Sequence, residues 1–190
     1  IKQYPLPKDA SVTLRDYQHQ GYNWLRFLQE YNFSGILTDD MGLGKTIQTL
    51  VFLQHEHDKK WTKSPTLIVV PTSLVLNWMD EAAKFVPKLK IQYINDGKTG
   101  FSDIFPDTQI IIVSYGIIAN LIEEPDFEKK KFHYVILDEA QNIKNLATAR
   151  TKSILKLKAS HRLALSGTPI ENNLIELYSI FNFLMPWFIG

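Results

Sequence analysis

The segment Ile36–Leu50, ILTDDMGLGKTIQTL, indicates the fold more directly than any other part of this 190-residue chain. It begins with a short apolar run and, after polar and glycine residues, continues into a stretch whose apolar side chains have helical spacing. A strand, a glycine-rich turn and a helix in this order are typical of the start of a β-α-β unit. We therefore expect an α/β fold.

The turn within this segment has the residues that a phosphate-binding loop (P-loop) requires. Glycines let backbone N–H groups point inward around a phosphate, and a helix that starts there adds the positive end of its dipole. Lys45 would reach the β- and γ-phosphates of a nucleotide, and the Thr46 hydroxyl would ligate Mg²⁺. The predicted nucleotide-binding residues are Asp40, Met41, Gly42, Leu43, Gly44, Lys45 and Thr46.

The match to the general loop pattern is incomplete, because Asp39 stands where that pattern has its first glycine. The alternative is an ordinary glycine turn that caps a helix. A predicted strand before the turn and a predicted helix after it favour phosphate binding.

Short apolar runs alternate with helical patterns along the whole chain, without an internal repeat. Several runs are apolar throughout, which is typical of parallel strands that helices cover on both faces. With 45% hydrophobic and 22% charged residues, a chain of this length is expected to form one domain with a substantial core. The predicted fold is α/β, a single lobe with a mainly parallel sheet and helices on both faces, with strands at Gly35–Thr38, Thr66–Val70, Ile91–Ile94, Ile110–Ser114, Tyr134–Asp138 and Leu163–Ser166.

Three helices are predicted from apolar side chains at helical spacing. The clearest begins near Val75, carries Trp78 and Met79 in the core, and ends at Pro87. Thr72 or Ser73 would cap its start. The other two are expected from about Arg15 to Tyr31, with Tyr17, Gly21, Trp24, Leu25 and Leu28 on one face, and near the end of the sequence, with Leu174, Leu177, Phe181 and Leu184. Polar stretches broken by glycine or proline predict surface loops at Asp96–Gly100 and Glu123–Lys131.

A second polar cluster follows a predicted strand in YVILDEAQ, residues 134–141. Ligands of open α/β sheets bind at the carboxyl edge of the strands, where Asp138 and Glu139 would lie. Adjacent carboxylates repel each other, so a cation is expected, and Mg²⁺ held by Asp138 and Thr46 would supply it. Glu139 would then orient and polarise an attacking water. An acidic N-cap of the next helix is the alternative, and it explains one carboxylate better than two.

The segment LALSGTPIENNL, residues 163–174, places Ser166, Gly167 and Thr168 after another predicted strand. Taken alone, it is typical of a turn and a helix cap. Together with the glycine-rich turn and the acidic pair, it brings polar groups to three strand ends. The combination predicts a site that hydrolyses a nucleoside triphosphate rather than one that only binds it.

Composition excludes several other classes of protein. The chain has no cysteine, which excludes a disulfide framework, a thiolate zinc site and a cysteine nucleophile. The longest apolar stretch, Ile110–Ile122, is interrupted by polar residues and is shorter than the roughly 20 residues of a membrane helix, so no membrane partner is expected. The missing initiator Met and the apolar run at the end suggest a piece of a longer protein.

Charge is unevenly distributed, although the net charge is only +1. Between Lys129 and Arg162, nine basic residues face Asp138 and Glu139, a local charge of +7 that leaves −6 for the rest. Such a run favours a polyanionic partner. The alternative is a solvated helix face, because Lys152 and Lys156 are spaced four apart.

The order of the three motifs resembles that of the superfamily-two helicase-like ATPases, and in detail that of the Swi/Snf (sucrose-nonfermenting) family. The acid at Asp39 is usual in that family, and Gln141 followed by NIKN resembles its prokaryotic branch. DEAD-box RNA helicases differ there and lack the PTSLVLNW segment. The matching segments span nearly the whole chain: LRDYQHQGYNWL (14–25), DDMGLGKTIQTL (39–50), VVPTSLVLNW (69–78), VSYG (113–116), LDEAQNIKN (137–145) and LSGTPIENNL (165–174).

This resemblance implies that residues 1–190 are the first RecA-like lobe, the ATP-binding domain, of a DNA-dependent ATPase. Such motors hydrolyse ATP with Mg²⁺ between two lobes and move along double-stranded DNA, remodelling protein–DNA complexes. The second lobe, which supplies arginine fingers, lies outside this sequence, so the lobe alone should be nearly inactive. The resemblance implies a cytoplasmic location at the nucleoid in a prokaryote, or a nuclear one in a eukaryote. It does not imply which complex is remodelled.

The resemblance also implies roles for single residues. Gln18 would read the adenine edge, because an amide both donates and accepts; a solvated helix residue is its alternative. A core aromatic is the alternative for Tyr115. The implied catalytic residues are Lys45, Asp138, Glu139 and Gln141, with Gln141 sensing the γ-phosphate; Ser166 and Thr168 would couple hydrolysis to movement, and Thr72, Ser73, Ser114 and Tyr115 would contact DNA phosphates.

Two other functions stay open at this point. One is a scaffold lobe that holds nucleotide or DNA without hydrolysis, and the other is a lobe of an RNA helicase. Lys45, Thr46 and Glu139 argue against the scaffold, since a lobe without turnover need not keep them. Stimulation of the two-lobed protein by duplex DNA or by RNA would separate the remaining two.

Overall fold

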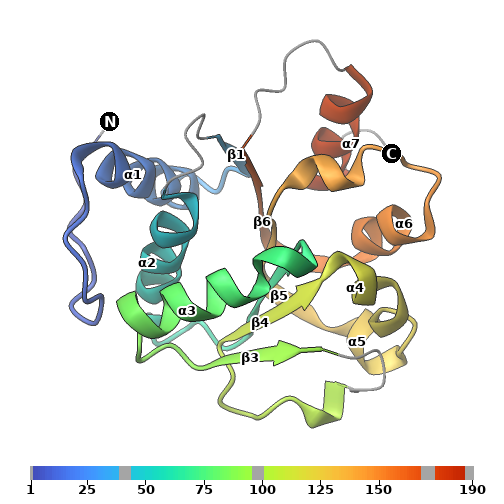
Figure 1. Ribbon diagram of the computed structural model, residues 1–190, viewed down its shortest axis with the longest axis horizontal. Coiled ribbons are helices and arrows are strands. Elements are labelled where there is room, and N and C mark those ends of the chain that lie inside the picture. Colours follow the sequence, from blue (N-terminus) through green and yellow to red (C-terminus); the bar gives the residue numbers. More distant parts are fainter. Residues whose placement is uncertain (1, 39–43, 96–100, 168–173, 187–190) are drawn as a thin grey trace.

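Six strands form one parallel sheet in the order β1-β6-β5-β2-β4-β3 in the computed structural model, which describes residues 2–38, 44–95, 101–167 and 174–186 (Figure 1). A tight turn cannot join two neighbouring parallel strands, so the chain crosses over the sheet between successive strands, mostly through a helix. The strands are β1 (Gly35–Thr38), β2 (Thr66–Val70), β3 (Ile91–Ile94), β4 (Ile110–Ser114), β5 (Lys131–Leu137) and β6 (Lys158–Ser166).

The six predicted strands are confirmed, four of them with the predicted bounds. β5 and β6 begin earlier than predicted, and their extra residues pair from Lys131 opposite Lys158 onward. Exposed residues alternate with buried or half-buried ones in these added parts, so no apolar run marks them in the sequence. The buried halves of both strands are apolar throughout and were therefore recognisable.

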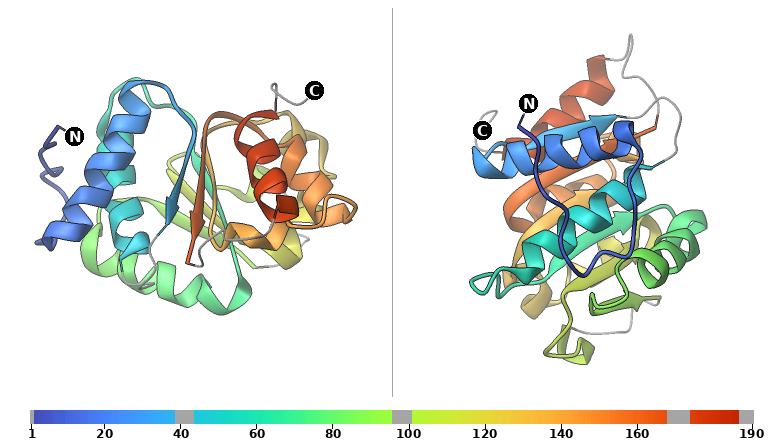
Figure 2. Two further views of the ribbon diagram at one scale, coloured as in Figure 1. Left: turned by 90° about the horizontal axis from the view of Figure 1, so that it is seen from above. Right: turned by 90° about the vertical axis from the view of Figure 1, so that its left-hand side faces the viewer.

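Helices cover both faces of the sheet, as predicted (Figure 2). The first three helices pack on one face, and the other four pack on the opposite face. The first group is α1 (Asp16–Glu30), α2 (Lys45–Asp58) and α3 (Val75–Phe85); the second is α4 (Tyr115–Leu121), α5 (Pro125–Lys129), α6 (Ala149–Lys156) and α7 (Leu174–Leu184).

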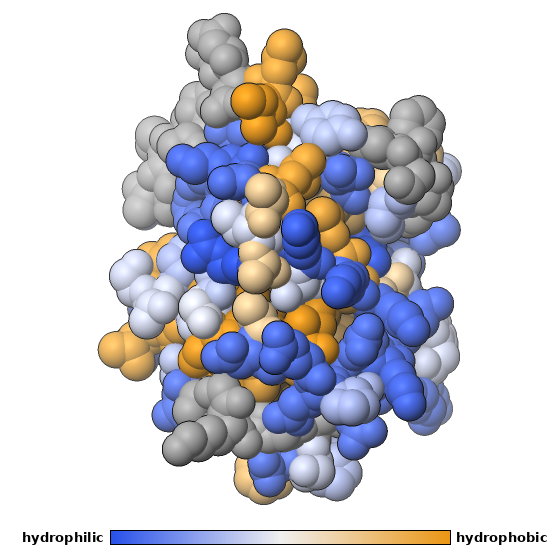
Figure 3. Space-filling view, turned by 90° about the vertical axis from the view of Figure 1, so that its right-hand side faces the viewer, coloured by the Kyte–Doolittle hydropathy of each residue, from blue (hydrophilic) through white to orange (hydrophobic). Residues whose placement is uncertain are grey.

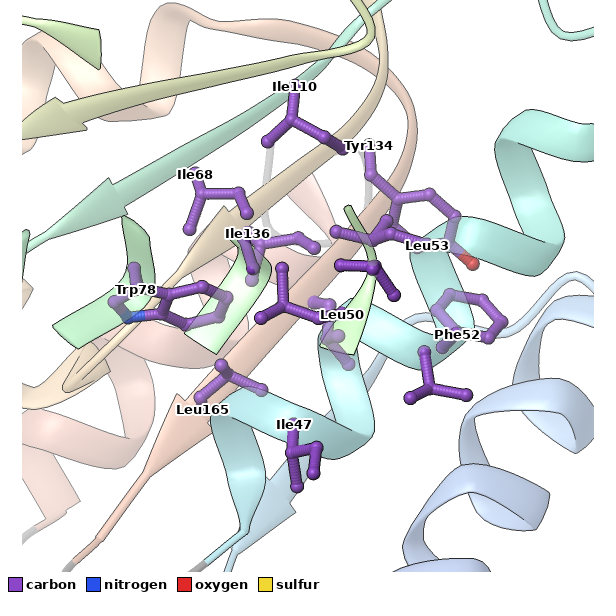
Figure 4. Close-up of a cluster of buried hydrophobic side chains, with 14 of the residues drawn as sticks. Ile47, Leu50, Phe52, Leu53, Ile68, Trp78, Ile110, Tyr134, Ile136 and Leu165 are labelled. Atoms are coloured by element: carbon purple, nitrogen blue, oxygen red, sulfur yellow. The ribbon is translucent and has the colours of Figure 1, made fainter. Parts of the chain in front are cut away.

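Successive strand residues feed two separate cores, one on each face. On β4, Ile110 and Ile112 point into the core under α1, α2 and α3, which also holds the fully buried Trp78 (Figure 4). Ile111 and Val113 point into the other core. This alternation is the period of two that a strand imposes.

The predicted cap of α3 is wrong. Thr72 and Ser73 lie in a turn of 3-10 helix, η1 (Thr72–Leu74), and the α-helix starts after Leu74 without a side-chain cap. The N–H of Leu74 instead donates to the carbonyl of Pro71 at 2.9 Å. The tighter turn satisfies backbone groups that a capping hydroxyl would have served, and both hydroxyl residues remain exposed.

The predicted faces of two other helices need correction. On α7, Leu174 is 82% exposed and Leu177 is 40% exposed, whereas Ile180 and Phe183 are fully buried. The helix is apolar almost all round, so spacing alone could not select its buried face. Figure 3 shows the resulting apolar surface over α7 at the top of the view. On α1 the buried residues are Tyr22, Asn23, Leu25 and Leu28, while Tyr17 is 41% exposed.

One predicted surface loop is partly helical. The segment Glu123–Lys131 contains α5, which begins with Pro125 and buries Phe127 between α4 and β5. Proline suits the first turn of a helix, so its presence did not exclude one. The other predicted loop, Asp96–Gly100, lies outside the described residues.

The basic run from Lys129 to Arg162 does not form one surface. Arg162 is buried and donates to the carbonyl of Leu157 at 2.6 Å, and the Arg150 guanidinium lies 5.6 Å from the centre of the Tyr115 ring. Lys152 and Lys156 are exposed on α6, as the solvated-face alternative predicted. No helix within the described ranges is both long and apolar enough to cross a membrane.

Histidines gather around the buried Glu56 of α2, at the amino ends of the central strands. His133 Nε2 lies 3.0 Å from Glu56 Oε1, and Lys59 Nζ lies 2.7 Å from Glu56 Oε2. His57 Nε2 lies 2.9 Å from Thr66 Oγ1, and its ring lies edge-on to that of His133. Burial lowers the pKa of His57 to about 4, with the nearby His133 as a lesser cause.

We expect acid to destabilise the fold through His57. This side chain takes up its proton near pH 4 when folded and near pH 6.5 when unfolded, so the unfolded chain binds more protons between these values. Stability should therefore fall below about pH 6.5, with His57 contributing roughly 1–2 kcal/mol by about pH 5. Urea unfolding at about pH 6.5 and at about pH 5 measures the loss of stability. His57→Gln should lose less stability than the wild type, and an equal loss in both proteins would contradict the assignment.

Candidate active site

The carboxyl ends of β1, β5 and β6 meet at one edge of the sheet. Leu37 of β1 pairs with Leu165 of β6, and Leu137 of β5 pairs with Ala164 of β6. The three sequence motifs, the glycine-rich turn, the acidic pair and the segment from Ser166, lie at the ends of these three strands. The register therefore brings together segments that are about 100 residues apart in the sequence (Figure 1).

Lys45 is the first residue of α2, and its side chain is buried at this edge. Gly44 precedes it with φ of 120°, a backbone conformation that favours glycine. The Lys45 ammonium lies 3.8 Å from Glu139 Oε1. Of the predicted nucleotide-binding residues, Asp40, Met41, Gly42 and Leu43 lie outside the described ranges.

Asp138 is the most enclosed acid of the site, with 4% of its surface exposed. Trp78 Nε1 donates to its Oδ2 at 2.8 Å, and the backbone N–H of Glu139 donates to its Oδ1 at 2.9 Å. Burial raises the pKa of Asp138, and the Glu139 charge adds to this effect, while the Trp78 hydrogen bond opposes it. The carboxylate is therefore held in place by neutral donors but lacks a close cationic partner among the described residues.

Glu139 takes a left-handed backbone conformation, with φ of 47°. This sharp change of direction after β5 aims its side chain back toward Lys45. Gln141 Nε2 donates to Glu139 Oε2 at 2.6 Å, and Ser166 Oγ lies 3.5 Å from Gln141 Oε1. The side chains of Lys45, Glu139, Gln141 and Ser166 thus form one polar chain across three strand ends.

Gly167 leaves space for this chain. A Cβ atom at position 167 would lie 2.8 Å from Lys45 Nζ and 3.1 Å from Glu139 Oε1. Any side chain there would displace one of the two charged groups. Thr168, the other predicted coupling residue, lies outside the described residues.

Gln18 lies near the start of α1, beside the amino end of α2. Its Oε1 accepts the backbone N–H of Arg15 at 2.9 Å, and its Nε2 lies 3.2 Å from the position that a Cβ on Gly44 would take. Next to it is a hollow of about 300 Å³ lined by both residues and by side chains of α2 and α3. Gln18 therefore lies beside the amino end of α2, and its role at the adenine edge stays a prediction.

The four predicted DNA-contact residues divide into two pairs. Thr72 and Ser73 are exposed on η1. Ser114 and Tyr115 are buried, and the Tyr115 hydroxyl donates to the backbone carbonyl of Asp138 at 2.7 Å. Tyr115 thus takes the position that the core-aromatic alternative predicted, and its hydroxyl fixes the backbone of the acidic turn.

Sequence reasoning placed Trp78 in the core but missed its hydrogen bond to Asp138. Its helical stripe gave no signal of a polar partner, since the indole ring packs like any large apolar group. Asp138 follows a different strand, 60 residues later in the chain. Only the packing of α3 over the carboxyl end of β5 brings the two side chains together.

The oxygen atoms at this edge fit a magnesium ion. The carboxylate of Asp138 and the hydroxyl of Thr46 are hard oxygen ligands of the kind that Mg²⁺ prefers. Each Asp138 oxygen accepts one hydrogen bond, which leaves it a free lone pair. Within the described ranges, no group of three or more His, Asp or Glu side chains could hold a metal unaided.

The sheet, the buried lysine at the amino end of α2 and the acidic turn after β5 define an α/β lobe of the P-loop type, built to hold an anionic ligand at the carboxyl edge of its strands. The profile of the SNF2-related domain matches residues 17–190, and the chain belongs to this family. The solved Sulfolobus solfataricus SWI2/SNF2 ATPase core in complex with double-stranded DNA has the same fold. It is 35% identical, with a TM-score of 0.86 over 98% of this chain and 38% of that one.

Curated relatives come from bacteria and fungi. Helicase swr1 of Schizosaccharomyces pombe is 47% identical over 92% of this chain, and an uncharacterized ATP-dependent helicase of Mycoplasma pneumoniae is 42% identical over 94%. The chain spans only 14% and 17% of these two relatives. The RecA-like α/β lobe that the sequence predicted is confirmed. Relatives from both kinds of organism match similarly well, so assignment to the prokaryotic branch stays a prediction.

We predict that Trp78→Phe perturbs the Asp138 carboxylate while it largely preserves the apolar packing of the core. The ring stays apolar, but Asp138 loses its side-chain hydrogen bond and a buried acceptor is left without a donor, which should cost about 1–3 kcal/mol of folding stability. The pKa of Asp138 should rise further, because the Trp78 hydrogen bond is the largest of the effects that oppose burial. Urea unfolding measures the first effect and carboxyl NMR titration the second. An unchanged carboxyl titration in Trp78→Phe would contradict this role.

Proposed function

We propose that this chain is the ATP-binding lobe of a DNA-dependent ATPase that moves along double-stranded DNA and remodels protein–DNA complexes. The observation that carries the proposal is the polar chain from Lys45 through Glu139 and Gln141 to Ser166, which links the phosphate-binding segment to two other strand ends. A site that only held nucleotide would need the lysine but not the carboxylate–amide–hydroxyl series behind it. Membership of the SNF2-related family supports the same reaction.

Each described residue of the site has a role in this proposal. Lys45 binds the β- and γ-phosphates, and Thr46 and Asp138 hold Mg²⁺, which neutralises phosphate charge when bound. Glu139 orients and polarises the attacking water, because its carboxylate is aimed into the edge and hydrogen-bonded by Gln141. Gln141 then couples this carboxylate to Ser166 of the neighbouring strand, whose Oγ lies 3.5 Å from Gln141 Oε1.

The proposed partners of the whole protein include double-stranded DNA and a second RecA-like lobe. The lobe spans 38% of a solved ATPase core whose complex contains double-stranded DNA, which supports DNA and a second RecA-like lobe as partners. The exposed apolar side chains Leu174 and Ile175 of α7 support a further packing partner on the same side. Thr72 and Ser73, exposed after β2, are the proposed contacts to DNA phosphates. Such a protein works at the nucleoid of a prokaryote or in the nucleus of a eukaryote.

Two substitutions should separate nucleotide binding from hydrolysis. Lys45→Ala removes a buried charge partner of the phosphates and should weaken ATP binding by about 10- to 150-fold. Glu139→Gln should keep ATP binding but slow turnover by about 10²- to 10⁴-fold in the full-length protein. Calorimetric titration with Mg-ATP and a phosphate-release assay measure the two effects. Lys152→Ala, an exposed lysine of α6 on the other face of the sheet, is the matched control. Normal ATP binding by Lys45→Ala would refute the phosphate site.

The isolated lobe should hydrolyse ATP far more slowly than the full-length protein. Lys45, Asp138 and Glu139 lie on one lobe, but an arginine finger from a second lobe would be missing, and its loss typically costs about 10³- to 10⁵-fold in rate. Duplex DNA should stimulate only the full-length protein, since it acts on lobe closure. Phosphate release with and without DNA tests both statements. Stimulation by RNA instead of duplex DNA would favour the RNA helicase alternative.

A further inference from the structure

The residues before α1 form an irregular strap, residues 2–14, that reaches from α1 to α3 (Figures 1 and 2). It contains one turn, in which the N–H of Ala10 donates to the carbonyl of Pro7 at 3.2 Å. None of the roles above uses this segment. It is nevertheless a packed part of the lobe, because four of its apolar side chains lie half-buried against the core under α1, α2 and α3: Leu6, Ala10, Val12 and Leu14.

Tyr4 anchors the strap on α1. Its side chain is buried, its backbone N–H donates to Asn23 Oδ1 at 2.9 Å, and its carbonyl oxygen lies 2.9 Å from His19 Nε2. The Arg26 guanidinium lies 4.6 Å from the centre of the Tyr4 ring, and the Tyr4 hydroxyl donates to Glu30. These α1 residues are spaced four, three and four apart, so they share one face of the helix. One strap residue therefore contacts α1 over about three turns.

The other attachment of the strap is on α3. The N–H of Ser11 donates to the carbonyl of Phe85, the last residue of α3, at 2.8 Å. Phe85 also lines the hollow beside Gln18. Since α1 and α3 each pack mainly on α2, the strap connects two helices that border this hollow from different sides.

The Ser11 attachment lies four residues before Arg15, whose backbone N–H donates to Gln18 Oε1 at 2.9 Å. This bond orients the Gln18 side chain, while its Nε2 and the second lone pair of its oxygen stay available to a ligand. The short connection from Ser11 to Arg15 limits how far Gln18 can move away from Phe85.

We propose that the strap is a positioning element for the nucleotide base: through Tyr4 on α1 and Ser11 on α3, it holds Gln18 in place beside the hollow. The inference rests on the proposed ATP site and assigns part of its affinity to residues that do not contact the ligand. A loosened α1 would have to be ordered again when the base binds, and such ordering lowers affinity. The hydrogen bonds of the strap go to α1 and α3, whereas Lys45 lies on α2, so phosphate binding should not depend on the strap.

The test compares Mg-ATP with Mg-tripolyphosphate, which has the phosphate chain without ribose and base. Dissociation constants are measured by calorimetry for the full-length protein, for Tyr4→Ala, and for Ser11→Pro, which removes the N–H that donates to Phe85. Both variants should bind ATP about 5- to 30-fold more weakly, while binding of tripolyphosphate changes less than about twofold. The KM for ATP should rise accordingly, and kcat at saturating ATP should change less than about twofold.

Two control variants separate positioning from general stability. Phe127→Leu loosens the core on the opposite face of the sheet, so it should lower the free energy of unfolding without changing the ratio of the two dissociation constants. Tyr4→Phe keeps the ring and both backbone contacts of Tyr4 and should retain most of the wild-type affinity for ATP. Urea unfolding of all variants shows how much stability each has lost.

The supporting result is weaker ATP binding by both strap variants with tripolyphosphate binding intact. Equal weakening of both ligands would show that the strap only maintains the lobe and would overturn the inference. Wild-type ATP affinity in both strap variants would also overturn it, and if Lys45→Ala still weakens ATP binding, the proposed function stands. ATP binding that Lys45→Ala leaves intact would refute the phosphate site, and this inference with it.

Discussion

The register of three parallel strands is the constraint on which the site depends. Ile136 and Leu165 point into the core under α2 and α3, while Leu137 and Ala164 point into the core under α6 and α7. A shift of one residue in β5 or β6 would turn the side chains of that strand toward the opposite core. The packing that excludes this shift also fixes where the chain leaves β5, and therefore where Asp138 lies. The position of the Asp138 carboxylate is thus set by apolar burial many residues away from it.

The charges at this edge are incomplete without a ligand. Lys45 is buried beside Glu139, whereas Asp138 is held by an indole N–H and a backbone N–H, both neutral. Neutral donors fix the direction of a carboxylate but do not cancel its charge, so the cost of burying it remains. An Mg²⁺ ion with phosphate oxygens would meet this requirement, and the same argument explains why the pKa of Asp138 is raised in the free lobe.

The sequence predicted those parts of the fold in which one local pattern had one explanation. The strands were recognisable because their central residues are buried on both faces, and the carboxyl-edge location of the motifs followed from the α/β order. The buried face of α7 could not be predicted, because the helix itself carries apolar residues on nearly every side. The bond from Trp78 to Asp138 joins residues 60 positions apart in the chain, and no local spacing encodes it. Family resemblance supplied roles for single residues, but it could not show that Tyr115 is buried.

The hollow beside Gln18 and the edge that carries Lys45 and Asp138 are connected through contacts of α1 and α3. Gln48 of α2 is buried between Gly21 of α1 and Gly44, and a Cβ at position 21 would overlap its side-chain amide. Because α1 can approach α2 this closely only at a glycine, the same contact sets how far Gln18 stands from Gly44. A shift of α1 would therefore move Gln18 relative to Lys45, while α3, which also lines the hollow beside Gln18, positions Asp138 through Trp78. The position of Gln18 and the orientation of the Asp138 carboxylate then depend on contacts of α1 and α3, so a change in the hollow would also affect this edge of the sheet.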